Sequence, residues 1–375
     1  MLNVQNIILR EIRLPLVEPF QISSGVEHER RILLVEVHDT HGAFGWGECV
    51  AGAGPNYAPE TIDTAWIMIR DWVAPRVLGK EIEHPSQVHA LLERNFRGHN
   101  MAKAAVEMAL WDLYAQIAGV SLAELLGGTR DVIATGISLG IQDSPETLAR
   151  KAAAARAEGY RKIKVKIRPG EDVQYVRAVV GELGDTSIVM ADANSAYTLD
   201  DTEHLQKLDA LGLLMIEQPL AWDDLRRHAE LQKHLRTPLC LDESITSLDR
   251  AEDMIALQSG RIINIKAGRV GGHTASIAIH DLCAANDIPV WCGGMLESGI
   301  GRAHNVALAS LPNFTLPGDV SPSARYWAED IVEPEWTMDK EGFVTVPRDF
   351  PGIGVEVNTK RVEALTVRCE NVRTM

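Results

Sequence analysis

The chain has 375 residues, of which 46% are hydrophobic and 24% are charged. This balance is typical of a globular protein and excludes a disordered chain, a collagen-like fibre and a coiled coil, while the length suffices for two domains. Lys and Arg number 37 against 52 Asp and Glu, so the formal net charge is −15. An acidic chain is a poor match for nucleic acid or an anionic membrane, and we expect neither as a partner.

The cysteines and the N-terminal residues indicate a cellular location. Five cysteines are widely spaced and form no CxxC motif, so we expect reduced, mostly buried thiols in a cytoplasmic protein. The apolar patch at the N-terminus is broken by Arg10 and Glu11, which predicts a first β-strand rather than a signal peptide. No uncharged apolar run reaches the length of a membrane-spanning helix.

The first third of the chain predicts an α+β domain. Segments 4–14 and 31–37 are rich in Ile, Leu and Val and predict strands. Two polar, glycine-containing stretches, 18–30 and 51–61, predict flexible loops. Segment 101–118 has apolar residues at three- and four-residue spacing and predicts a helix.

From about residue 132 the chain alternates short apolar segments with amphipathic stretches. The candidate strands are 132–138, 163–167, 187–192, 213–217, 238–242, 262–266, 289–293 and 314–318. Polar residues near successive strand ends, from Ser138 to Lys266, are separated by 28, 26, 25, 25 and 24 residues. About that many residues make one strand–helix unit, so the rhythm predicts a parallel α/β barrel. A doubly wound open sheet is the alternative, but no glycine-rich dinucleotide fingerprint opens the series.

Lysines alternate with Ile and Val across residues 162–167. The apolar row suits the helix-facing side of a barrel strand, which leaves Lys164 and Lys166 pointing inward. Mutual repulsion and loss of solvent then favour the neutral amine, and such a lysine can act as a base near neutral pH. A solvated basic edge strand would explain the lysines alone, but not the carboxylates that follow.

Three carboxylates end successive apolar segments, namely Asp192, Glu217 and Asp242. A carboxylate at the end of a buried strand needs a partner. Singly, each would be explained by a helix N-cap or a buried salt bridge. Together they would converge at the barrel mouth, where a divalent cation is the simplest partner, and oxygen ligation suits Mg²⁺ or Mn²⁺.

A second lysine, Lys266, ends the segment 262–266 and shares its face with Asn264. It is expected across the mouth from Lys166, with the metal between them. One divalent cation and two opposed amines fit proton abstraction alpha to a carboxylate, because the enediolate concentrates negative charge where a cation can stabilise it. Glu297 is a better candidate for a structural hydrogen-bond network than for catalysis.

The candidate catalytic and metal-binding residues resemble those of the enolase superfamily in their order and spacing. They are Lys164-Val-Lys166, Asp192-Ala-Asn194, Glu217, Asp242-Glu243 and Lys266. That superfamily pairs Lys or His bases with Mg²⁺. The two lysine positions resemble the muconate lactonizing enzyme subgroup. Within it, GGMLESGIGRAHN at 293–305, PGD at 317–319 and Lys266-Ala-Gly-Arg269 resemble the o-succinylbenzoate synthase / N-acylamino acid racemase family.

The resemblance implies a TIM-like (β/α)7β barrel with an α+β N-terminal capping domain that the C-terminal tail completes. We expect the capping domain at 1–128, the barrel at 129–340 and a segment packing back on the cap at 341–375. By the resemblance, Asp192, Glu217 and Asp242 bind Mg²⁺, which Mn²⁺ or another divalent cation can replace. Lys166 and Lys266 form the acid/base pair, and Lys164 assists the metal-bound carboxylate. The residues expected to contact substrate are Phe20, Tyr57, Ser138, Asn194, Arg269, Gly294, Met295, Leu296 and Tyr326.

The implied function is an Mg²⁺-dependent lyase, an o-succinylbenzoate synthase of menaquinone biosynthesis, or an N-acylamino acid racemase, or both. Arg269 resembles a residue of racemase-capable members, which favours a dual activity. The substrate is a small-molecule carboxylate, and barrels of this type often form homo-oligomers. The alternatives are a dipeptide epimerase or cycloisomerase of the same superfamily and a non-catalytic metal-binding barrel.

Overall fold

The computed structural model describes residues 1–22, 25–170 and 172–373. Its N-terminal part is an antiparallel sheet in the order β16-β1-β2-β3, with β4 paired to β1. The strands are β1 (Leu2–Ile22), β2 (Gly25–Asp39), β3 (Phe44–Cys49), β4 (Glu81–Ile82) and β16 (Thr366–Arg373). The helices that accompany the sheet are α1 (Ile62–Met68), a π-helical turn (Ile69–Val73), α2 (Ala74–Val77), α3 (Ser86–Glu93), α4 (Asn100–Ala118) and α5 (Leu122–Leu125).

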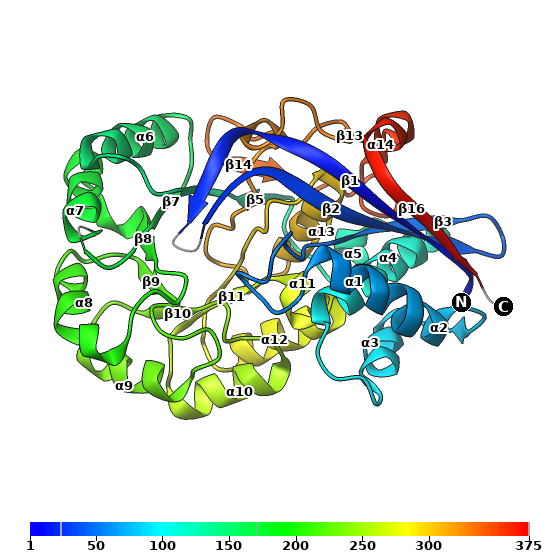
Figure 1. Cartoon of the computed structure of the whole chain (residues 1–375), viewed down its shortest axis with the longest axis horizontal. Helices are drawn as coiled ribbons and strands as arrows, with labels where there is room; N and C mark the ends of the chain where they lie inside the picture. Colours follow the sequence, from blue (N-terminus) through cyan, green and yellow to red (C-terminus); the bar gives the residue numbers. More distant parts are fainter. Residues whose placement is uncertain (23–24, 171, 374–375) are drawn as a thin grey trace.

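Strand alternation sends successive side chains of β2 to opposite faces of the sheet, and residues 32–35 are buried on both faces. On β2, Leu33 and Val35 pack with the cap helices, whereas Ile32 and Leu34 belong to a core shared with the barrel. This part of β2 therefore lies between the cap helices and the core shared with the barrel. Figure 1 shows β1 and β2 as a long blue hairpin that runs from the cap toward the barrel, with β16 in red beside β1.

The hairpin corrects one expectation from the sequence. Segment 18–30 was expected to be a flexible loop, but β1 continues to Ile22 and β2 begins at Gly25; residues 23 and 24 lie outside the described residues. Phe20 pairs with Glu27 and Gln21 with Val26 across the two strands. Backbone pairing therefore extends through a polar sequence that lacks an apolar strand pattern.

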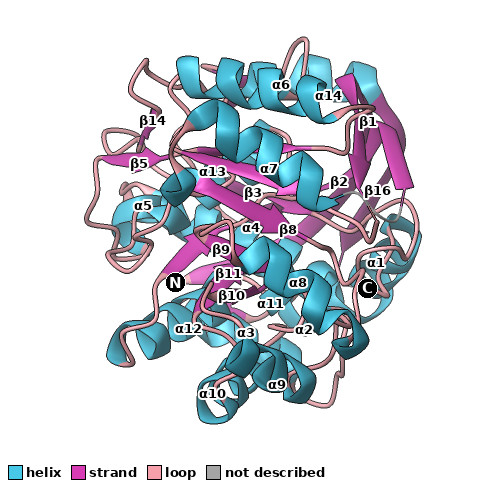
Figure 2. Cartoon of the chain, turned by 90° about the vertical axis from the view of Figure 1, so that its left-hand side faces the viewer, coloured by secondary structure: helices cyan, strands magenta, loops and turns pink. Residues whose placement is uncertain are grey.

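The second part of the chain is a curled sheet of seven parallel strands, in the order β12-β11-β10-β9-β8-β7-β6. The strands are β6 (Gly136–Leu139), β7 (Lys162–Lys166), β8 (Val189–Asp192), β9 (Met215–Glu217), β10 (Leu239–Leu241), β11 (Ile262–Ile265) and β12 (Val290–Cys292). The helices are α6 (Pro145–Ala157), α7 (Asp172–Leu183), α8 (Thr202–Asp209), α9 (Arg226–His234), α10 (Leu248–Leu257), α11 (Ala267–Val270), α12 (His273–Ala285) and α13 (Gly299–Ala309), with 3₁₀ turns at Thr186–Ile188, Leu199–Asp201 and Ser323–Arg325. Figure 2 shows helices α6 to α10 outside these strands, as in a TIM-like α/β barrel.

Two of the expected strands differ from the prediction. Segment 132–138 divides into β5 (Val132–Ala134), which pairs with β14, and the barrel strand β6. Segment 314–318 forms no regular strand, yet it lies between the two ends of the curled sheet. The Gly136 N–H donates to the Gly318 carbonyl at 2.6 Å, and the Asp319 N–H donates to the Cys292 carbonyl at 2.8 Å. A single extended segment thus links β6 and β12 where a full eighth strand was expected.

The last part of the chain returns to the cap. Its elements are β13 (Val332–Glu333), β14 (Phe343–Thr345), β15 (Glu356–Val357) and α14 (Thr359–Leu365), followed by β16. β13 pairs with β15, and β16 pairs antiparallel with β1 from Asn6 to Ile12. Among the described residues, no helix is both long and apolar enough to cross a membrane.

Candidate active site

The alternation predicted for β7 is confirmed. Ile163 and Val165 lie in the apolar core that the barrel strands share with the surrounding helices. The Lys162 and Lys164 amines lie on the other face, 3.3 and 4.9 Å from the ring centre of Trp291 on β12. Strand β7 therefore carries its lysines across the barrel interior, as the period of two requires.

Lys164 lies among three carboxylates, which changes its expected ionisation. Its Nζ is 2.5 Å from Asp319 Oδ2, 3.4 Å from Glu217 Oε2 and 3.5 Å from Asp192 Oδ2. Burial alone would lower the pKa of Lys164, but these carboxylates, Asp319 foremost, raise it well above its ordinary value. The expectation of a neutral amine is thus wrong for this lysine, because neighbouring negative charge outweighs desolvation.

Lys166 contacts the end of the next strand. Its Nζ donates to Asp192 Oδ2 at 2.6 Å and to Asn194 Oδ1 at 2.7 Å. Burial would raise the pKa of Asp192, yet the charges of Lys166 and Lys164 hold it below its ordinary value. The backbone N–H of Asn194 also donates to Asp192 Oδ1 at 3.0 Å, so the loop after β8 is fixed around the lysine.

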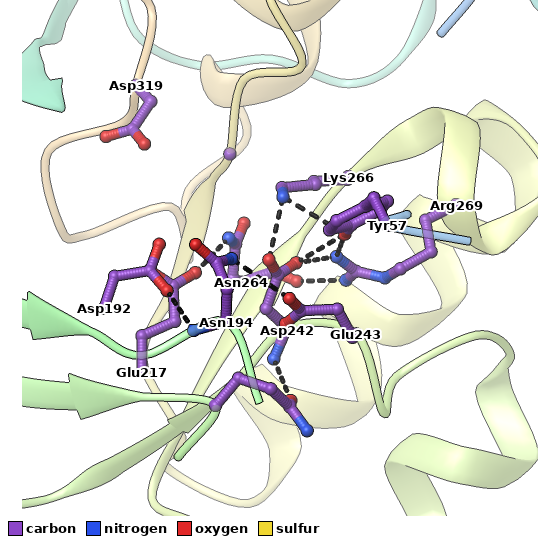
Figure 3. Close-up of polar contacts among 12 residues, drawn as sticks. Tyr57, Asp192, Asn194, Glu217, Asp242, Glu243, Asn264, Lys266, Arg269 and Asp319 are labelled. Carbon is purple, nitrogen blue, oxygen red and sulfur yellow. Dashed lines mark hydrogen bonds and ion pairs between the residues drawn. The ribbon is translucent and has the colours of Figure 1, made fainter. Parts of the chain in front are cut away.

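Lys266 follows β11 and belongs to a separate cluster, which Figure 3 shows with Tyr57, Asp242 and Arg269. Its Nζ lies 2.8 Å from Asp242 Oδ2 and 3.1 Å from the Tyr57 hydroxyl. Arg269 pairs with Asp242 and donates to the Tyr57 hydroxyl at 3.1 Å. Burial would lower the pKa of Lys266, but Asp242 and Tyr57 raise it, which favours the ammonium form.

The three predicted metal ligands end adjacent strands and influence one another electrostatically. Burial, followed by the charge of Asp192, raises the pKa of Glu217 to about 8. Asn264 donates to Glu217 Oε1 at 2.7 Å, while Glu217 Oε2 is buried with no hydrogen-bond partner. Within the described part of the chain, no three His, Cys, Asp or Glu side chains are already grouped to hold a metal. Asp242 contacts Lys266 and Arg269.

The donor set nevertheless fits a hard divalent cation. All three side chains are carboxylates with exposures of 1% or less, and Mg²⁺ prefers oxygen ligands. Glu217 Oε2 is buried and makes no hydrogen bond, although Lys164 Nζ lies 3.4 Å away, so this carboxylate oxygen is available as a ligand.

One cavity of about 210 Å³ connects most of the predicted residues. Lys166 and Lys266 both line it, from strands separated in the sheet by β8, β9 and β10. Of the predicted substrate contacts, those that line the cavity are Phe20, Tyr57, Ser138, Asn194, Gly294, Met295, Leu296 and Tyr326. Arg269 lies outside it, because its guanidinium contacts Asp242 and the Ile245 and Asn264 carbonyls.

Asp319 is the main residue of this site that the sequence interpretation left without a role. It lies between Lys162, at 3.3 Å, and Lys164. The two lysines hold its pKa down, at about 2, although burial would raise it. The sequence does contain a signal for Asp319. Three inward-facing lysines on one strand need negative charge buried near them, and Asp319 directly follows an apolar segment. Arg30 and Glu27 of β2 also line the cavity and were not predicted.

Comparison with known proteins identifies similar chains over nearly the whole length. Residues 5–127 match the mandelate racemase / muconate lactonizing enzyme N-terminal domain, and residues 147–361 match the enolase C-terminal domain-like family. An o-succinylbenzoate synthase of Bacillus subtilis (strain 168) is 50% identical, covering 96% of this chain and 95% of that protein. An N-succinylamino acid racemase of Amycolatopsis sp is 47% identical, covering 94% and 95%. A crystal structure of an enolase superfamily member from Listeria innocua superposes with a TM-score of 0.95 at 40% identity over the full length of both chains.

Proposed function

Because the chain belongs to the mandelate racemase / muconate lactonizing enzyme family of the enolase superfamily, we propose that it removes a proton alpha to a carboxylate of a small molecule. The proposed reactions are dehydration of 2-succinyl-6-hydroxy-2,4-cyclohexadiene-1-carboxylate to o-succinylbenzoate and racemisation of N-succinylamino acids. Relatives with these two activities, at 50% and 47% identity, support this pair. The observation that carries it is that Lys166 and Lys266 line one cavity from well-separated strands.

In the proposed racemisation, Nζ of one lysine removes the α-proton and Nζ of the other returns a proton to the opposite face. Lys166 acts as base for one enantiomer and Lys266 for the other, so each amine alternates between its neutral and charged forms. In the dehydration, Lys166 takes the proton and returns it to the departing hydroxyl group, which leaves as water. Lys266 stays an ammonium ion and stabilises the enediolate charge. The contact of Lys266 with Asp242 favours that charged form.

Asp192, Glu217 and Asp242 would hold the proposed Mg²⁺, with Mn²⁺ or another divalent cation as a substitute. When bound, the cation supplies electrostatic stabilisation of the negative charge that develops on the substrate carboxylate. Lys164, at the centre of Asp192, Glu217 and Asp319, adds a fixed positive charge beside that carboxylate. A homo-oligomer and a cytoplasmic location stay predictions.

The test is a kinetic comparison of the two substrate classes with the same preparation. We expect measurable kcat/KM for both the cyclohexadiene carboxylate and an N-succinylamino acid. In D₂O, both enantiomers of the amino acid derivative should lose their α-hydrogen to solvent. Dipeptides and muconate serve as the comparison substrates, and turnover confined to either would replace this proposal with an epimerase or a cycloisomerase. A chain that binds Mg²⁺ but exchanges no α-hydrogen would be a non-catalytic barrel.

A further inference from the structure

A hydrogen-bonded chain connects Lys166 to a carboxylate outside the substrate cavity. Lys166 Nζ donates to Asn194 Oδ1 at 2.7 Å, and Asn194 Nδ2 donates to Glu243 Oε1 at 3.1 Å. Glu243 lies in the loop after β10, is 5% exposed and does not line the cavity that contains the two lysines. Figure 3 shows Asn194 and Glu243 on either side of Asp242, with the hydrogen bond between them drawn as a dashed line.

Glu243 fixes which end of the Asn194 amide faces the lysine. Glu243 Oε1 accepts a hydrogen bond from the Asn194 NH₂ group, which leaves the Asn194 oxygen as the acceptor that faces Lys166 Nζ. The reversed amide would present two donors to a lysine amine and an oxygen to a carboxylate oxygen. The Asn194 backbone has a φ of 42°, in the left-handed region that asparagine tolerates, so its side chain is directed from a constrained loop.

Lys166 has four rotatable side-chain bonds, and its reactive nitrogen needs an anchor that remains after the proton moves. The Asn194 oxygen supplies one, because it accepts an N–H from either the amine or the ammonium form. Lys266 is held by a different set, Asp242 and Tyr57. Asn194 therefore anchors Lys166 and not Lys266.

We propose that Glu243 is a positioning residue for the Lys166 half of the proton transfer, acting through Asn194. The proposal rests on the two-base function proposed above. Since a misplacement of about 1 Å can cost on the order of 100-fold in rate, loss of the Glu243 acceptor should slow abstraction by Lys166 selectively. A residue that only stabilised the barrel would affect both directions equally.

The experiment measures α-hydrogen exchange in D₂O for each enantiomer of an N-succinylamino acid. Lys166→Ala and Lys266→Ala first assign each enantiomer to its lysine. Glu243→Leu, which keeps the volume but removes the acceptor, should slow the Lys166 enantiomer roughly 10- to 100-fold and the other less than about 2-fold. Glu243→Gln keeps an acceptor oxygen and should recover most of the lost rate. Mg²⁺ affinity by calorimetry should fall far less in both variants than in a variant of a proposed ligand such as Asp242→Asn, because Glu243 is not one of the proposed ligands.

Equal slowing of the two enantiomers, or a matched loss of Mg²⁺ affinity, would overturn the positioning role in favour of a structural one. Failure of Glu243→Gln to restore the rate would also overturn the hydrogen-bond account. If Glu243→Leu fails to fold, Glu243→Met provides the same comparison. If the wild-type protein exchanges the α-hydrogen of neither enantiomer, the proposed function is overturned and this inference with it. If the wild type exchanges both, the proposed function stands and the Glu243 variants test the positioning role alone.

Discussion

At the scale of single residues, the two lysines that line the cavity have different partners. Lys166 contacts Asp192 and Asn194, whereas Lys266 contacts Asp242 and Tyr57. A variant that lacks one lysine amine loses the proton transfer which that amine carries out. Racemisation needs a transfer on both faces of the substrate, whereas dehydration needs only one base. The two activities therefore separate the roles of the two lysines.

We expect Lys166→Ala to lower kcat for both substrate classes by about 10²-fold or more, the usual contribution of a positioned acid or base. Lys266→Ala should abolish racemisation, while dehydration loses only the stabilisation by an ammonium ion. Lys266→Arg serves as the control, because it keeps a positive charge but cannot act as a base. Wild-type dehydration rates in Lys166→Ala would contradict the assignment of the base.

Metal removal tests the carboxylate cluster. We expect EDTA to abolish both activities and Mg²⁺ to restore them, because the proposed ligands are all oxygen donors. Asp242→Asn should weaken Mg²⁺ binding measured by calorimetry, since it removes one negative charge. Asp223→Asn, an exposed carboxylate of the loop after β9, is the matched control and should bind Mg²⁺ as the wild type does. Full activity after exhaustive chelation would exclude the metal.

Asp319 and Lys162 form a buried ion pair that a single substitution would break. Lys162 is fully buried, and Asp319 is 5% exposed. Leaving a buried charge without its partner costs about 3–5 kcal/mol, so we expect Asp319→Asn to lower the free energy of unfolding by that order in urea titrations. Adding Lys162→Met should recover part of the loss, because it removes one of the uncompensated amines. Unchanged stability in the single variant would contradict the pairing.

At the scale of elements, β3 and α4 pack closely because Gly45 and Gly47 of β3 face the backbone of α4. A Cβ at Gly47 would collide with the Ala105 carbonyl oxygen and lie 3.0 Å from the Ala109 nitrogen. These neighbours are backbone atoms, which cannot rotate away. Glycine at this position therefore sets the distance between the cap sheet and its central helix.

We expect Gly47→Ala to lower the unfolding temperature, with a loss of about 1–3 kcal/mol typical of overpacking. Gly181→Ala is the matched control, because Gly181 lies within α7 and a Cβ there would meet nothing within 4 Å. That variant should be neutral or more stable by about 0.5–1 kcal/mol, since alanine favours helix. Equal thermal unfolding of the two variants would contradict the close packing of β3 on α4.

At the scale of the whole molecule, the cap and barrel are joined by carboxylates at helix N-termini. Glu48 of β3 accepts hydrogen bonds from the Ser298 hydroxyl, at 2.6 Å, and from the Gly301 N–H, at 3.0 Å, where α13 begins. Glu107 of α4 accepts from the His273 and Thr274 N–H groups, at 2.8 and 2.9 Å, where α12 begins. Free N–H groups and the helix dipole both favour an acidic partner there.

Glu48 makes this junction sensitive to pH. Burial raises the pKa of Glu48 to about 8, above its ordinary value of 4.5, despite the hydrogen bonds that lower it. The folded chain then holds a proton that the unfolded chain releases, so the stability contribution of Glu48 falls as pH rises from about 4.5 to about 8. Each pKa unit corresponds to about 1.4 kcal/mol, which limits the effect to a few kcal/mol. The difference in unfolding free energy between wild type and Glu48→Gln should decline over that range in urea titrations, and a constant difference would contradict it.

Much of the architecture follows from periodicity along the chain. The spacing of about 25 residues predicted parallel α/β units, and the alternation in 162–167 predicted which face of β7 carries the lysines. Both depend on local geometry, since strand period and unit length are properties of consecutive residues. The resemblance to the enolase superfamily was confirmed by the family comparison. The domain boundaries and the roles of the site residues stay predictions.

Other features depend on residues that are distant in sequence. The pKa of Lys164 is raised foremost by Asp319, which lies 155 positions away in the sequence. The guanidinium of Arg269 contacts Asp242 instead of lining the cavity. Residues 20–22 and 25–27 of the polar segment pair through their backbones, and the segment around Gly318 links β6 to β12 with a few hydrogen bonds. Ionisation and side-chain direction inside a barrel reflect the summed field of all the strands, so no single stretch of sequence encodes them.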